Sequence, residues 1–199
     1  MITLTEIKDP SQLSRQELIL MTALRLFTER GYFNTSIHDI QRESKVSIGS
    51  IYHYFKNKEG IARELFVGLV TAMDEGMDQI DRSHTTAHDR CRAALAWLMG
   101  LTRRSPAVMK FILYARHREF LPEEKPICSS GPFLRMKEMV RRGMDEGEIR
   151  AMDITVASAS LFGSGIRMIH LDLDGVLEQP VESYLDEIWD CAWRSVKTG

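Results

Sequence analysis

The sequence has little cysteine and none of the short motifs that mark common enzyme families. Three cysteines occur among 199 residues (Cys91, Cys128 and Cys191), and no CxxC pair or Cys/His cluster stands at metal-ligand spacing. The GxSxG, P-loop, HExxH and GxGxxG motifs are also missing. We therefore expect no enzyme, no metal ion and no cofactor. The three thiols are expected to be reduced, with a redox sensor at one of them as the alternative.

Long apolar runs and targeting signals are not found either. No apolar run approaches the roughly 18 residues that span a bilayer. The N-terminal sequence MITLTEIKDP has neither the basic region nor the apolar core of a signal peptide. Hydrophobic residues make up 44% of the chain and the net charge is −2, which is ordinary for a globular protein. We expect a cytoplasmic protein without a membrane partner.

Apolar residues repeat with the period of a helix along most of the chain. Leu20, Ala23, Leu24 and Phe27 form one such stripe, and Ser14 and Glu17 stand before it at the spacing of a capping box. We find no alternation typical of strands, so the sequence predicts an all-α fold. Further helices are predicted after Thr35 or Ser36, after Ser47, from Lys58 for about six turns, and over residues 85–104, 106–116, 132–146, 153–171 and 180–197.

The first three helical patterns are joined by turns too short for anything but a helix-turn-helix bundle. Its third helix, Ser47 to His53, is short and carries small or polar residues that let a backbone approach base edges. The hydroxyl and imidazole groups that follow can reach phosphate oxygens, as can the basic and helix-capping residues nearby. The predicted DNA contacts are Thr35, Ser36, Lys45, Ser47, Ile48, Gly49, Ser50, Tyr52, His53 and Lys58.

The segment FTERGYFNTSIHDIQRESKVSIGSIYHYFKNKEGI resembles the N-terminal DNA-binding domain of the TetR family of bacterial transcriptional regulators. The resemblance covers about 45 residues and implies a homodimer with a divergent C-terminal domain for small ligands. It also implies that Ser47 through His53 read bases, and that Thr35, Tyr52, His53 and Lys58 contact phosphates. The family usually has Gly where Lys45 stands, so this lysine is expected at positive φ, at a cost of about 1 kcal/mol.

These observations predict an N-terminal three-helix helix-turn-helix DNA-binding domain over residues 1–60 and a C-terminal helical ligand-binding and dimerisation domain over residues 61–199. The C-terminal part is rich in aromatic and Met side chains, which suit an adaptable apolar pocket. Arg116 or His117 could hold an anionic end of a ligand. The predicted pocket residues are Trp97, Met109, Phe111, Tyr114, His117, Phe133, Met136 and Phe162.

The last two predicted helices have the pattern of a dimer interface. A Gly-Ser-Gly sequence allows close helix approach, and the final helix has more apolar surface than one face of a monomer needs. The predicted interface residues are Gly163, Ser164, Gly165, Tyr184, Ile188 and Trp189.

The sequence thus predicts a homodimeric transcriptional regulator of the TetR type. Its partners are a palindromic double-stranded DNA operator and a small, mainly apolar effector that releases the repressor. One alternative is a ligand-binding helical protein that does not bind DNA. Another is a repressor that responds to oxidation of a cysteine.

Overall fold

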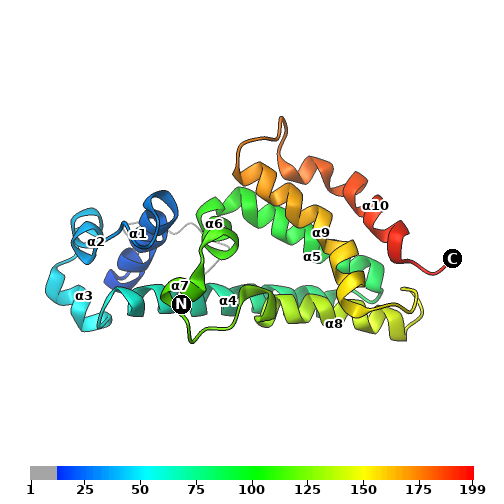
Figure 1. The fold of residues 1–199 in the computed structure, drawn as a ribbon, viewed down its shortest axis with the longest axis horizontal. Helices are drawn as coiled ribbons and strands as arrows, with labels where there is room; N and C mark the ends of the chain where they lie inside the picture. The colour runs from blue at the N-terminus through cyan, green and yellow to red at the C-terminus, as the bar shows by residue number, and fades with distance from the viewer. Residues whose placement is uncertain (1–12) are drawn as a thin grey trace. The chain divides into compact units, whose positions relative to one another are not determined.

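The computed structural model describes residues 13–199. The N-terminal sequence MITLTEIKDP, which is not expected to be a signal peptide, lies outside the described residues. The predicted all-α fold is confirmed: the described chain contains helices and no strand, apart from one isolated bridge between Ile149 and Lys197. The α-helices are α1 (Arg15–Arg30), α2 (Ile37–Ser44), α3 (Ile48–Tyr54), α4 (Lys58–Ser83), α5 (Ala87–Arg104), α6 (Pro106–Tyr114), α7 (His117–Phe120), α8 (Gly131–Asp145), α9 (Ile154–Leu173) and α10 (Leu185–Val196) (Figure 1).

The helix starts follow from local side-chain chemistry. Ser14 and Glu17 form the predicted capping box on α1, in which each side chain bonds the other residue's backbone amide. Ser36 and Asp39 form a second such box on α2, and Ser47 caps α3. These caps satisfy amides that a helix leaves free, so three short helices can begin within 34 residues of one another.

The chain divides into two compact units. The first contains the described residues up to Ala72 together with Ala107–Ser130, and the second contains Met73–Pro106 with Gly131–Gly199. The first unit is therefore larger than the predicted domain 1–60, because it includes the first half of α4 and helices α6 and α7. Within it, α1, α2 and α3 pack on one another (Figure 1).

The second unit is built from α5, α8, α9 and α10, with the second half of α4. Helix α9 packs against α5, α8 and α10. Gly165 on α9 permits this packing, because a Cβ there would lie 2.3 Å from Leu95 Cδ1 on α5. Ion pairs join α4 to α8: the Arg135 guanidinium bonds the Asp74 and Asp78 carboxylates at 2.8–3.0 Å.

Helix α9 bears on the expectation that no apolar stretch is long enough to span a bilayer. Its 20 residues include an 18-residue window with a mean hydropathy of 1.2, so by length and composition alone it could cross a membrane. It contacts three other helices of its own unit, and 28% of its most apolar window is buried. The apolar character of α9 thus serves packing on one side and leaves a second, exposed side.

The remaining differences concern helix boundaries. The predicted helix over residues 106–116 ends at Tyr114, and a separate short helix, α7, follows at His117. The predicted final helix begins with a 3₁₀ turn, Val181–Tyr184, before α10. The predicted loop after Phe120 contains a 3₁₀ turn at Ile127–Ser129.

Candidate nucleic-acid interface and pocket

One side of helix α3 packs against neighbouring helices, and the other side is exposed to solvent. Ile51 is fully buried against the neighbouring helices, while Gly49, Tyr52 and His53 are exposed. Half of the Tyr52 side chain is accessible, at 52%. Ile48 and Ser50 are half-buried, and Ser47 is exposed, with its Oγ accepting a bond from the Ser50 amide at 3.2 Å. The structure therefore brings the predicted base-reading residues together on one short helix.

The turn before α3 contains a strained lysine. Lys45 has φ 57° and ψ 20°, and it is the non-glycine residue with positive φ in the described chain, as the sequence predicted. This left-handed conformation costs an L-residue about 1 kcal/mol. The Lys45 side chain is exposed next to α3, so its charge is available to a phosphate.

Thr35 requires a correction. It was predicted to contact a phosphate, but the residue is 1% exposed and its backbone amide donates to the Tyr32 carbonyl oxygen at 3.3 Å. The Thr35 hydroxyl donates to the Gly31 and Leu26 carbonyl oxygens, at 2.9 Å and 3.3 Å. Thr35 therefore fixes the α1–α2 connection from inside the fold. Ser36 is exposed, although its hydroxyl bonds the Asp39 carboxylate at 2.6 Å.

Lys58 was also predicted to reach a phosphate, and the structure gives it an internal role. Its ammonium donates to the Tyr32 and Thr35 carbonyl oxygens, both at 2.9 Å, and lies 4.1 Å from the centre of the Tyr32 ring. Burial lowers the pKa of Lys58. Two of the three N–H donors of the Lys58 ammonium thus connect the start of α4 to the α1–α2 loop by hydrogen bonds.

The predicted pocket residues are divided between the two units. Met109, Phe111, Tyr114 and His117 belong to the first unit, whereas Trp97, Phe133, Met136 and Phe162 belong to the second. Met136 and Phe162 are each 3% exposed and form part of the second unit's core. Trp97 packs over Gly76 on α4, where a Cβ would lie 2.6 Å from its ring.

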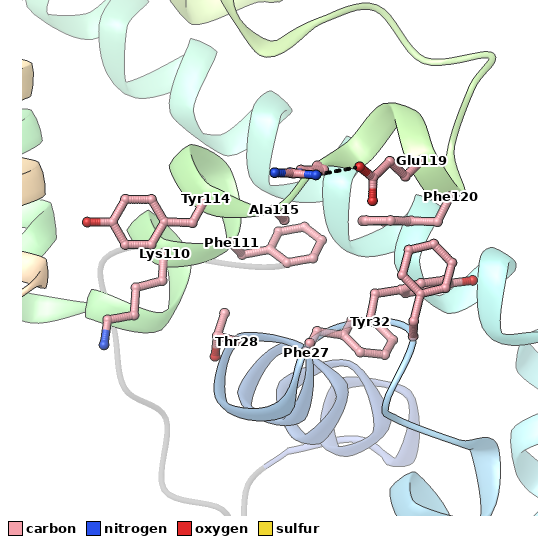
Figure 2. A pocket seen from close by; sticks show the side chains of 12 residues that line it. Phe27, Thr28, Tyr32, Lys110, Phe111, Tyr114, Ala115, Glu119 and Phe120 are labelled. Carbon is pink, nitrogen blue, oxygen red and sulfur yellow. Dashed lines mark hydrogen bonds and ion pairs between the residues drawn. The ribbon is translucent and has the colours of Figure 1, made fainter.

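A pocket of about 310 Å³ lies inside the first unit, between α1 and the α6–α7 segment (Figure 2). Of the eight predicted ligand-binding residues, Phe111 and Tyr114 line it. Sequence reasoning missed the α1 side of the pocket, because Phe27 and Tyr32 have the spacing and chemistry of core residues. The full lining is Phe27, Thr28, Gly31, Tyr32, Phe33, Lys110, Phe111, Tyr114, Ala115, Arg116, Glu119 and Phe120.

His117 lies behind this lining. Its ring is 4.7 Å from that of Phe66 and 4.9 Å from that of Phe111, and the residue is 8% exposed. Burial lowers the pKa of His117 to about 4, so the ring is neutral at neutral pH. A neutral imidazole keeps one N–H donor but supplies no positive charge for an ion pair with a ligand.

The predicted dimer residues have different surroundings. Gly163 and Ser164 are exposed on α9, and a Cβ at Gly163 would meet no atom within 4 Å. Gly165 and Trp189 are instead buried within the chain, which corrects their predicted place in the interface. The Trp189 indole donates to His88 Nε2 at 2.8 Å, and Gly165 packs on Leu95. Tyr184 and Ile188 are half-buried.

The described thiols differ in their access to solvent. Cys91 is fully buried, and burial raises its pKa to about 12, so its reactive thiolate form is suppressed. Cys191 is exposed on α10. The backbone of Cys128 forms part of the 3₁₀ turn Ile127–Ser129.

Comparison with known proteins places the helix-turn-helix segment in a family. Residues 19–65 match the family model described as bacterial regulatory proteins, tetR family. A 68-residue segment is 43% identical to the HTH-type transcriptional regulator HbdR of Aromatoleum sp. strain CIB. This alignment covers 34% of the chain and 28% of HbdR, so the chain spans under a third of that relative's length.

Solved structures extend the similarity of fold to nearly the whole chain. A TetR family transcription regulator from Marinobacter aquaeolei VT8 superposes with a TM-score of 0.75 at 16% identity, covering 93% of this chain and 96% of that one. The transcriptional regulator FadR from Bacillus subtilis, in complex with stearoyl-CoA, gives 0.75 at 20% identity, covering 88% and 96%. At these identities the likeness establishes the fold, an N-terminal helix-turn-helix followed by a helical C-terminal part.

Proposed function

Because residues 19–65 match the tetR family of bacterial regulatory proteins, we propose that this chain is a homodimeric transcriptional repressor of that family. It binds a palindromic double-stranded DNA operator through α3 and leaves the operator when a small, mainly apolar effector binds. A protein that regulates bacterial transcription acts where the chromosome is, so we place it in the cytoplasm.

The observation that carries the proposal is the exposed side of α3. Gly49, Tyr52 and His53 face solvent while Ile51 anchors the helix. A Cβ at Gly49 would meet nothing within 4 Å, so the fold does not need a glycine there. The lack of a side chain at Gly49 instead allows a ligand such as a base edge to approach the backbone of α3 closely.

A two-fold dimer is supported by the exposed side of α9. Val156 is 53% exposed, and Ala159 and Gly163 follow it on the same side of the helix. This stripe of small and apolar residues allows a second copy of α9 to approach closely. The half-buried Tyr184 and Ile188 lie on the neighbouring 3₁₀ turn and α10.

Release by an effector is supported by the pocket beside α1. Six aromatic residues line it, which suits an apolar molecule. Its volume of about 310 Å³ stands at the small end of the range for ligand sites, which suits a small effector. An effector that prefers the released state by about 3 kcal/mol weakens operator binding roughly 150-fold.

Gly49→Ala tests the reading role of α3. The folded protein should be as stable as wild type or up to about 1 kcal/mol more stable, because alanine favours a helix. Its preference for the strongest-binding genomic fragment over random DNA should fall at least about tenfold, since a methyl group displaces the base edge. Gel-shift titrations with both DNAs measure this ratio.

Thr71→Ala on α4 provides the matched control, because it also adds helix propensity at an exposed position. Its DNA preference should equal that of wild type. If Gly49→Ala keeps the wild-type preference, α3 does not read bases. If wild type binds no DNA at all, the alternative of a ligand-binding protein without DNA binding replaces the proposal.

A further inference from the structure

We propose that the pocket between α1 and the α6–α7 segment binds a small planar aromatic carboxylate, with Lys110 as its cation. This inference rests on the proposed function, because it names the effector class and its site. The pocket lies wholly within the first compact unit, whose α1 also packs on α2 and α3.

Flat ring faces form the inner part of the pocket. The Phe27 and Phe111 rings lie 6.5 Å apart between centroids, with planes 22° from parallel. By contrast, Tyr32 and Phe120 are in face contact, at 4.1 Å and 14°. The first pair is therefore more widely spaced than the second, and both of its rings are buried, at 6% and 1% exposed. Ring faces of this kind favour contact with another flat ring over contact with a flexible chain.

Positive charge remains at the outer part of the pocket. Lys110 and Tyr114 project from α6 at the end opposite Phe120 (Figure 2). Arg116 pairs with Glu119 at 3.1 Å, so these two charges balance. Lys110 forms no ion pair or hydrogen bond with any residue in the described part of the chain. One unpaired cation beside an aromatic cavity matches a ligand with one negative charge.

The volume limits the ligand to a small molecule. A cavity of about 310 Å³ matches a one- or two-ring acid in size. One wall of the pocket belongs to α1 and the α1–α2 connection, and the other belongs to the α6–α7 segment. A ligand between the two walls favours one position of α1. Because α1 packs on α2 and α3, the ligand also favours one position of those helices.

The test uses 2-naphthoate as the probe and 2-naphthalenemethanol as its uncharged counterpart, with binding measured by calorimetry. Wild type should bind the carboxylate about two- to fivefold more tightly than the alcohol, as expected for one partly exposed ion pair. Lys110→Met should remove this preference and leave binding of the alcohol unchanged. Lys125→Met, an exposed lysine of the same unit outside the pocket lining, should behave as wild type.

Thr28→Phe tests the location of the site. The Thr28 hydroxyl bonds carbonyl oxygens of its own helix, so its loss leaves other elements unaffected, and the larger ring occupies the cavity. Binding of both probes should fall at least about tenfold, in line with displacing a buried ring contact. Ala115→Leu fills the same cavity from α6–α7 and replaces Thr28→Phe if circular dichroism shows that the latter misfolds.

Three results separate this inference from the proposed function. The inference is overturned if wild type binds 2-naphthoate no better than the alcohol, or if a folded variant with the cavity filled binds it as wild type does. If the protein binds DNA but not the probe, the pocket inference fails and the repressor proposal stands. If it binds the probe in a Lys110-dependent way but binds no DNA, the repressor proposal fails and the pocket stands.

Discussion

Gly163→Trp is expected to convert the protein into folded monomers and to weaken operator binding about a hundredfold or more, equivalent to about 3 kcal/mol. Nothing lies within 4 Å of a Cβ at this position, so the folded chain accommodates the larger side chain. A two-fold contact through the exposed side of α9 would bring two such indoles together at the axis, where there is no room for them. Sedimentation velocity and gel-shift titration measure the two effects.

Gly165→Trp is the contrasting variant two residues further along α9. Its Cβ would collide with the Leu95 side chain, so this protein should lose its fold before it loses its dimer contact. Circular dichroism and thermal melting distinguish the two outcomes. A Gly163→Trp protein that sediments as a dimer and binds DNA with wild-type affinity would show that the dimer contact lies elsewhere.

Lys58→Met is expected to lower the free energy of unfolding by about 2 kcal/mol, because two carbonyl oxygens lose a charged donor and the Tyr32 ring loses its cation. Methionine keeps the apolar stem of the side chain, so the change isolates the ammonium group. Urea unfolding followed by circular dichroism measures the loss. Lys56→Met, at an exposed position two residues earlier, should change stability by less than about 0.5 kcal/mol.

The salt dependence of DNA binding separates this internal role from a phosphate contact. If the Lys58 ammonium is committed to Tyr32 and Thr35, the slope of log affinity against log salt should be unchanged under conditions where the variant is folded. A phosphate contact would reduce the slope by about one unit. A stable Lys58→Met protein with a reduced slope would restore the role that the sequence predicted.

Features that depend on neighbouring residues were predictable from the sequence. The capping boxes at Ser14 and Ser36, the cap at Ser47 and the positive φ of Lys45 each follow from chemistry within three or four residues. The long α4 follows from a sustained apolar stripe. These local features define the helix-turn-helix, which is why its position and its exposed helix were predictable.

Features that depend on distant partners were not predictable in this way. Lys58 bonds a carbonyl oxygen 26 residues earlier, and Thr35 bonds one nine residues earlier, so neither bond is visible as a spacing. Gly163 and Gly165 are indistinguishable in sequence, yet two residues on a helix point in nearly opposite directions, toward solvent and toward Leu95. The pocket similarly combines α1 with residues more than 80 positions later.

The central claim is that two copies of α3 read double-stranded DNA. The most direct measurement is selection of bound sequences from a random double-stranded library by the purified protein, followed by sequencing. We expect an enriched motif of two inverted half-sites whose centres lie about one helical turn, or a multiple of it, apart. A selection that enriches no motif, or only a single half-site without symmetry, would contradict it.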